Sequence, residues 1–125
     1  MRVFKNKWFH RWARGEGIAE NTLYDTAAEI IDGKVEADLG GYLFKKRLAR
    51  QGTGKSGGYR TIVGYKRTNS DRIIFLYAFA KSTRRNISGK EEAALSRVAE
   101  AFLSATDGQV EELMAQGAIW EVIKS

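Results

Sequence analysis

Residues 72–81 read RIIFLYAFAK and residues 59–66 read YRTIVGYK, two largely apolar segments on either side of the turn-forming sequence Asn69-Ser70-Asp71. Both segments have the length of β-strands and are rich in β-branched and aromatic residues. Residues 73–80 are apolar throughout, which is typical of a central strand that is covered on both faces. The short turn favours an antiparallel pair.

Further elements are predicted on both sides of these two strands. Residues 42–49 read as another strand and residues 2–4 as a short one. Residues 5–14 and 19–32 are predicted to form a helical hairpin, because Leu23, Ala27, Ile30 and Ile31 form one apolar stripe and Gly33 follows as a helix stop.

The C-terminal third of the chain has two helix-start signals. Ser88-Gly89-Lys90-Glu91 and Thr106-Asp107-Gly108-Gln109 both have the spacing of a capping box, in which two side chains satisfy exposed backbone N–H groups. They predict a helix over residues 88–103 and a shorter helix that ends near Gly117. Residues 119–123 read as a final strand.

The order of these elements predicts the fold class. Strands that follow one another through short loops favour an antiparallel sheet, and helices grouped at the chain ends favour α+β over α/β. We expect a compact antiparallel sheet of four or five strands, with the helices of residues 5–32 against one side and the 88–103 helix nearby. The 125 residues contain no repeat or linker, so we expect one domain spanning residues 1–125.

Composition excludes several classes of protein. The chain has no cysteine and one histidine, which argues against disulfides, thiolate zinc sites and a cysteine nucleophile. We therefore expect no metal and no small-molecule cofactor. No apolar run approaches the roughly 20 residues that a membrane span needs, and the N-terminus has no signal-peptide core. The expected location is the cytoplasm, without a membrane partner.

Basic residues are concentrated in the middle of a chain whose net charge is +6. Twelve of the 21 lysines and arginines lie between Lys45 and Arg85, together with one acidic residue, Asp71, so this segment has a net charge of +11. The rest of the chain holds nine basic and fourteen acidic residues, a net charge of −5. This distribution favours one polyanion-binding face over general solubilising charge.

The glycine-rich segment of residues 52–58 allows more than one interpretation. The sequence Gly52-Thr53-Gly54-Lys55-Ser56 matches part of a P-loop, but Ala49 occupies the position of the first glycine and a strand follows instead of a helix. A flexible hairpin loop is the simpler interpretation. A third is that Lys55 and the glycine amides contact a nucleic-acid backbone.

Other candidate groups are better explained by packing. His10 has no partner for catalysis in the sequence. Trp8 and Trp12, spaced i and i+4, are expected to form core rather than a base-stacking platform, and Trp120 is expected to pack as well. No serine has a nucleophile-elbow motif, so serine-hydrolase chemistry is unsupported. The acidic residues lie mostly on the outer helices, where they are typical of solvated faces.

Basic side chains can carry RNA cleavage by the RNA's own 2′-hydroxyl. That reaction needs a base, stabilisation of the charged phosphorane and an acid for the leaving 5′-oxygen. Arginine forks stabilise phosphate, and lysines crowded by positive charge can transfer protons. By strand alternation Lys45 and Arg47 share a face, and so do Arg60 and Lys66, but whether the two faces coincide stays open.

Three segments occur together in an order that resembles the RelE/ParE superfamily of toxins: 43–48 (LFKKRL), 58–60 (GYR) and 79–88 (FAKSTRRNIS). Within it, residues 46–60 (KRLARQGTGKSGGYR) are similar to a HigB-like branch. The resemblance covers nearly the whole chain and is strongest over residues 43–103. It implies a compact microbial-RNase-like sheet flanked by helices, ribosome-dependent cleavage of mRNA by a metal-independent endoribonuclease, and neutralisation by a cognate antitoxin.

The resemblance also assigns roles to individual residues. Lys45 and Arg47 match the basic strand pair near the scissile phosphate, and Arg60 matches the phosphate-binding arginine of the G-Y-R motif. Lys81 and Arg84 match the basic segment after the last long strand, which completes the expected catalytic set. The remaining expected RNA-binding residues are Lys46, Arg50, Lys55, Lys66 and Arg85. We expect Arg60, Lys81 and Arg84 to matter more than the equally basic Lys5 or Arg97.

The chain departs from the family pattern at one point. Well-studied RelE members have a tyrosine near the position of Ser88, and other members use histidines at the site, whereas this chain has neither there. The base and acid therefore stay unassigned. ParE-like members of the same fold inhibit DNA gyrase without cutting RNA, so a gyrase-inhibiting toxin remains an alternative, as does a plain nucleic-acid-binding domain.

Overall fold

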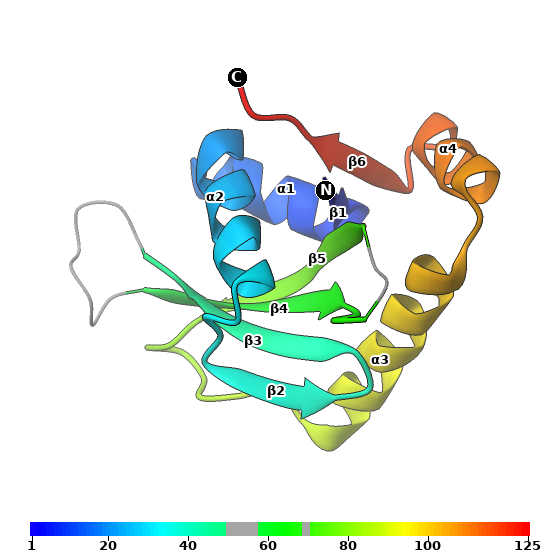
Figure 1. The fold of residues 1–125 in the computed structure, drawn as a ribbon. Helices are drawn as coiled ribbons and strands as arrows, with labels where there is room; N and C mark the ends of the chain where they lie inside the picture. Colours follow the sequence, from blue (N-terminus) through cyan, green and yellow to red (C-terminus); the bar gives the residue numbers. More distant parts are fainter. Residues whose placement is uncertain (50–57, 69–70) are drawn as a thin grey trace.

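The computed structural model describes residues 1–49, 58–68 and 71–125. Its elements, in chain order, are β1 (Arg2–Asn6), α1 (Lys7–Gly15), α2 (Glu20–Ile31), β2 (Ala37–Gly40), β3 (Leu43–Leu48), β4 (Tyr59–Tyr65), β5 (Arg72–Ala80), α3 (Gly89–Ser104), α4 (Asp107–Ala115) and β6 (Ile119–Val122). The strands form one mixed sheet in the order β2-β3-β4-β5-β1-β6 (Figure 1). The predicted α+β class is confirmed.

The direction of one strand pair differs from the prediction. The pairs β2–β3, β3–β4, β4–β5 and β1–β6 are antiparallel, as expected. However, β1 runs parallel to β5, with Val3 opposite Ile73. The sheet is therefore mixed and not wholly antiparallel. No short turn joins these two strands, so no local sequence signal specifies their relative direction.

One helix boundary and one strand also differ from the prediction, and both differences have local causes. The first helix begins at Lys7, because Asn6 ends β1 and its side chain accepts a hydrogen bond from the Phe9 N–H at 2.8 Å. The edge strand β2, of sequence ADLG, was not predicted. Aspartate and glycine disfavour strands, and a register irregularity interrupts the pairing between Asp38 and Gly40, so the alternation that marks a strand is absent.

Helices cover the two faces of the sheet. On the face that we call the α1/α2 face, Phe9, Leu23 and Ile30 pack against Val63 and Phe75. The α3 face is the opposite one, and its core comprises Phe4, Leu43, Ile62, Ile74, Leu76, Phe79, Ile87, Ala99, Phe102, Val110 and Ile119. No helix in the described ranges combines the length and apolar character required to cross a membrane.

The helix α3 approaches the sheet closely at one glycine. A Cβ atom placed on Gly64 of β4 would lie 3.0 Å from the Cβ of Ala99, closer than such atoms ordinarily come. At the other end of the same contact, the Ser96 hydroxyl donates to the Gly41 carbonyl at 2.7 Å. α3 therefore covers the end of the α3 face that contains Leu43 and Gly64. These two contacts lie away from the other end of β3 and β4, which contains Arg47 and Arg60.

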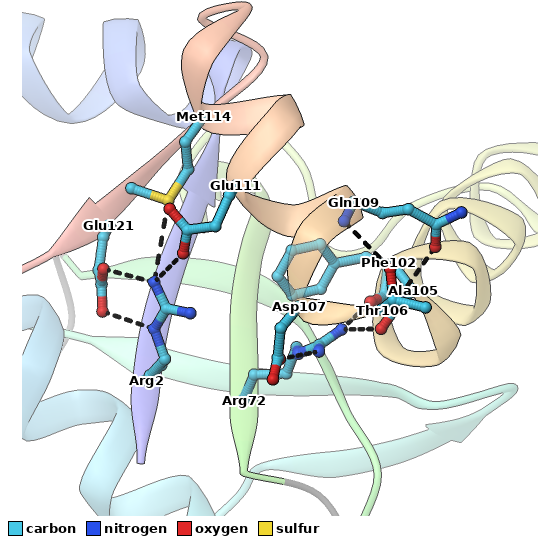
Figure 2. Close-up of polar contacts among 10 residues, drawn as sticks. All are labelled: Arg2, Arg72, Phe102, Ala105, Thr106, Asp107, Gln109, Glu111, Met114 and Glu121. Carbon is cyan, nitrogen blue, oxygen red and sulfur yellow. Dashed lines mark hydrogen bonds and ion pairs between the residues drawn. The ribbon is translucent and has the colours of Figure 1, made fainter.

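Arg72, one of the twelve basic residues of the charged segment, joins the sheet to the C-terminal helices (Figure 2). Its guanidinium donates to the carbonyls of Phe102 and Ala105 at 2.8 and 2.7 Å, and pairs with Asp107 at 3.0 Å. These carbonyls lie at the end of α3, where backbone acceptors lack intrahelical partners. Arg72 thus stabilises the α3–α4 junction.

Arg2, the register partner of Arg72, joins the neighbouring strand β1 to β6 and α4 in a similar way (Figure 2). It forms a two-pronged ion pair with Glu121 of β6, at 2.9 and 3.0 Å, and reaches Glu111 of α4 at 3.1 Å. The hydrogen bonds to Glu121 raise the pKa of Arg2 and lower that of Glu121. Both arginines serve the fold.

Candidate nucleic-acid interface

Strand register places two of the expected catalytic residues side by side. Arg47 of β3 lies directly opposite Arg60 of β4, and Lys45 lies opposite Ile62. Residues directly opposite one another project from the same face of a sheet. Because Ile62 belongs to the core of the α3 face, the three cations project from that face. The face of Lys45 and Arg47 and the face of Arg60, which the sequence could not relate to each other, are therefore the same face.

A carboxylate compensates the charge of this arginine pair. Glu36, just before β2, places Oε2 at 2.6 Å from Arg60 Nε, while Arg60 Nη1 donates to the Tyr59 carbonyl at 3.4 Å. Arg60 is only 5% exposed, and Glu36 keeps 37% of its side chain exposed. Like charges directly opposite each other are destabilising, so Glu36 offsets that cost and fixes the Arg60 side chain.

Sequence reasoning missed Glu36 because it lies outside the +11 segment, in a stretch with no strand pattern. Only the pairing of β2 with β3 brings it to the arginines, through a hydrogen bond from the Glu36 N–H to the Lys45 carbonyl at 2.8 Å. An isolated carboxylate between a helix and an unrecognised strand carries no signal of its own.

Arg84 is held on the same face by several partners. It forms a two-pronged ion pair with Glu91, at 2.6 and 3.1 Å, and donates to the Asn86 carbonyl at 2.9 Å. Its guanidinium lies 5.6 Å from the ring centre of Phe79, the register partner of Arg60. The Glu91 hydrogen bonds raise the pKa of Arg84, and the same bonds lower the pKa of Glu91 to about 2.

The other expected residues are distributed differently. Lys81 and Arg85 are exposed next to Arg84, beyond the end of β5. Lys66 is exposed beyond the other end of β4, with its Nζ 5.8 Å from the Tyr42 ring. At about 3.3 Å per residue, six residues along the strand separate it from Arg60 by roughly 20 Å. Lys66 is therefore remote from the arginine cluster.

Lys46 lies between Lys45 and Arg47 in β3, so its side chain projects from the opposite face, the α1/α2 face. Its Nζ donates to the Lys34 carbonyl at 2.7 Å and pairs with Glu29 of α2 at 3.4 Å, with 12% of the side chain exposed. The last two expected residues, Arg50 and Lys55, lie outside the described residues, as does most of the glycine-rich segment. The chain enters strand β4 at Tyr59, and no helix follows the segment as a P-loop would require.

Lys5, expected to be a residue of little consequence, has a structural partner. It is 5% exposed and pairs with Glu20 at 3.3 Å. Replacing it would leave a charged partner without its counterion, so Lys5 is a poor control for the basic face. Arg97 is exposed on α3 and forms no ion pair with any residue in the described ranges, so it is the better control.

The aromatic residues only partly follow expectation. Trp12 packs against the core of the α1/α2 face. Trp120 stacks on His10 with ring centres 4.2 Å apart and planes 1° from parallel. Burial lowers the pKa of His10, and its Nδ1 is buried without a hydrogen-bond partner. Trp8, in contrast, is 42% exposed, so the expectation that it packs in the core is wrong.

The cluster can bind anions and has no evident means of binding metals. Among residues 1–49, 58–68 and 71–125, no three histidine, cysteine, aspartate or glutamate side chains lie close enough together to hold a metal ion. Guanidinium groups from β3, β4 and the segment after β5 provide forked donors suited to phosphate oxygens. The arrangement suits a phosphodiester.

The fold and this face thus define a small basic α+β protein with several arginines and lysines on one sheet face. Comparison with protein families identifies the class further: residues 1–122 match the family described as the RelE toxin of the RelE/RelB toxin–antitoxin system. Because the match covers nearly the whole chain, the chain belongs to the RelE toxin family. No curated protein matches the chain. Its similarity to the HigB branch stays a prediction.

Proposed function

We propose that the chain is the toxin of a toxin–antitoxin pair and acts as a ribosome-dependent endoribonuclease that cleaves mRNA and thereby inhibits translation. The observation that carries the proposal is the position of Arg47, Arg60 and Arg84 on one sheet face, in a member of the RelE toxin family. Guanidinium groups are forked donors suited to phosphate oxygens, and here three of them come to one face from separate elements.

The proposed reaction is a transesterification within the RNA, so it balances without an oxidant, a reductant or a further reactant. The 2′-oxygen attacks the adjacent phosphorus, the bond from phosphorus to the 5′-oxygen breaks, and the products are a 2′,3′-cyclic phosphate and a 5′-hydroxyl. Arg47, Arg60 and Arg84 stabilise the charge on the non-bridging oxygens. The 2′-hydroxyl gives up its proton as it attacks and the leaving 5′-oxygen takes up a proton, while Lys45 and Lys81 add positive charge beside the phosphodiester; the base and the acid stay unassigned.

Glu36 acts as a positioning residue in this proposal. Its ion pair holds Arg60, whose side chain would otherwise face the like charge of Arg47 with no compensation. A preorganised donor stabilises the transition state without reorganisation at the moment of reaction. The position of Arg60 in the proposed phosphate site therefore depends on the segment just before β2, as well as on β3 and β4.

Mapping mRNA 5′ ends in cells that express the chain tests the proposal. Cuts should fall within translated frames, and they should disappear from a reporter whose start codon is removed. Cuts that persist in the untranslated reporter would indicate cleavage of free RNA. Gyrase-linked DNA breaks with intact mRNA would support the gyrase-inhibiting alternative, and intact mRNA with retained RNA affinity would support a plain nucleic-acid-binding domain.

A further inference from the structure

The exposed side chain of Trp8 is held in place rather than free to move. Asn6, two residues earlier, donates from its side-chain amide to the Leu76 carbonyl at 3.0 Å, which fixes the start of α1 beside β5. The Trp8 ring lies 4.5 Å from that of Tyr77, and 6.2 Å from that of Trp12 with planes 9° from parallel. Trp8 therefore presents an aromatic surface that is 42% exposed and held by neighbouring rings.

Tyr77 connects this aromatic surface to the arginine cluster. Arg84 Nη1 lies 3.5 Å from the Tyr77 hydroxyl. Tyr77 is also two residues along β5 from Phe79, which lies opposite Arg60. With strands about 4.8 Å apart and a rise of about 3.3 Å per residue, the Cα atoms of Tyr77 and Arg60 are roughly 8 Å apart. That separation is within the span of one or two nucleotides of a bound strand.

The surroundings of Trp8 are basic. Lys7 and Arg11, its neighbours on the first turns of α1, are exposed and form no ion pair within the part of the chain that the structure describes. Arg84 adds a third cation on the Tyr77 side. A protein partner with an apolar surface would leave Lys7 and Arg11 unmatched, whereas a polyanion with flat apolar bases complements both the cations and the aromatic surface.

We propose that Trp8 and Tyr77 form a stacking platform for an unpaired nucleobase of single-stranded RNA, beside the phosphate-binding arginines. The inference rests on the proposed ribonuclease function, to which it adds a base-binding subsite. Stacking on an aromatic ring stabilises any base, so the platform holds the strand in register next to the cleavage site. The base stacks on the exposed surface of Trp8, and Lys7, Arg11 and Arg84 contact the neighbouring phosphates.

Binding of two matched probes to the full-length protein tests the platform. One probe is a dye-labelled 2′-O-methyl RNA decamer, which the proposed reaction does not cleave, and the other is an abasic ribose-phosphate chain of the same length. Trp8→Ala should weaken binding of the decamer about 5- to 150-fold, the range for loss of one stacked base, and leave the abasic probe unaffected. Trp8→Phe should retain most of the difference, and Trp120→Phe is the control.

Each outcome bears on the proposal. If Trp8→Ala binds the decamer as wild type does, or weakens both probes equally, the platform is refuted while the ribonuclease proposal stands. If the wild-type protein binds neither probe, the platform fails because the unaltered face does not bind RNA, and this result is distinguishable from a failure of the variant alone. Trp8→Leu keeps apolar bulk without a stacking surface, so it gives the same answer if the alanine variant does not fold.

Discussion

At the scale of single residues, the hydrogen-bond and ion-pair partners of each lysine or arginine decide whether it stabilises the fold or is available to a ligand. Arg72 and Arg2 carry the same charge as Arg60, yet they donate their hydrogen bonds to carbonyls and carboxylates of the C-terminal elements and thereby stabilise the fold. Lys46, next in sequence to Lys45, lies against α2. The sequence identifies which residues are charged and how they alternate. It does not identify their counterions, which come from segments distant in sequence, as Glu36 does.

Arg60→Ala should lower the rate of mRNA cleavage on the order of 100- to 1,000-fold, the usual cost of removing one preorganised donor from a transition-state site. Arg97→Ala removes the same charge from an exposed position on α3 and should leave the rate unchanged. Arg60→Lys keeps the charge but loses the fork, and it should remain impaired. Cleavage is measured at equal protein level with the unfolding midpoint of each variant. Full activity of a folded Arg60→Ala variant would remove Arg60 from the site.

The stability of the protein should depend on the protonation of His10. Burial lowers its pKa in the folded state below the unfolded value of about 6.5, so the unfolded state binds more protons between the two values. The contribution of neutral His10 is complete above about pH 6.5 and is lost as the pH falls below it. The positive neighbours Lys5, Arg11 and Arg14 oppose protonation, while Glu20 favours it.

His10→Phe keeps an aromatic ring against Trp120 and removes the titrating group. Urea unfolding at pH 7.5 and pH 5.5 should show a smaller loss of stability for this variant than for wild type. An equal loss in both proteins would assign the pH dependence to other groups.

At the scale of elements, local signals were sufficient where neighbours in sequence pair with each other. Both predicted capping boxes are present, with Ser88 and Thr106 as the N-caps of α3 and α4. The β4–β5 pair follows from its two strand patterns and the turn residues between them, and β3 from its own alternation before the glycine-rich segment. β2 is the exception among these neighbours: it pairs with β3, the next strand in the chain, but its residues disfavour strands and its register is irregular, so no alternation marks it. The parallel β1–β5 pair was not predictable because it joins segments that are distant in sequence.

The capping box of α3 also supports the site, and the two roles can be separated. Ser88→Ala removes the N-cap and should cost about 1 kcal/mol of stability, as should Thr106→Ala in α4. Glutamine is accepted at the third helical position, where α4 has Gln109, so Glu91→Gln should preserve the cap. It removes the charge that orients Arg84, and therefore should lower cleavage activity more than Thr106→Ala does. Cleavage rates and urea unfolding of the three variants check this prediction, and unchanged activity of Glu91→Gln would contradict it.

The Arg84–Glu91 ion pair should also make the stability of the protein depend on pH in the acid range. The folded-state pKa of Glu91, about 2, lies below its unfolded value of about 4.3. The stabilising contribution of ionised Glu91 is therefore complete above pH 4.3 and is lost as the pH falls toward 2. Comparison of Glu91→Gln with wild type over pH 2–5 measures this contribution, and parallel stability curves would contradict it.

At the scale of the whole molecule, the +11 segment is not one uniform surface. Part of its charge stabilises the fold through Arg72, part lies against α2 through Lys46, and Lys66 is remote from the arginines. The cations that remain together are Lys45, Arg47, Arg60, Lys81, Arg84 and Arg85, on or next to the α3 face. Segment charge therefore predicted a polyanion partner, while three-dimensional register was needed to define the face.

The proposed function requires a partner that restrains the chain, because a nuclease acting on translating ribosomes would harm the cell that makes it. We predict a cognate antitoxin that binds this chain and restores growth when the two are co-expressed, as membership of a toxin–antitoxin family suggests. Its contact region should be acidic or amphipathic, since the chain carries a net charge of +6 and the arginine face is exposed at its rim. Electrostatic steering then predicts that the association rate falls as salt is raised, with less change in the dissociation rate. Pull-down and stopped-flow binding with the products of the neighbouring open reading frames measure this. If neither neighbour binds or rescues growth, the toxin proposal loses its main support and a stand-alone nucleic-acid-binding domain becomes the better account.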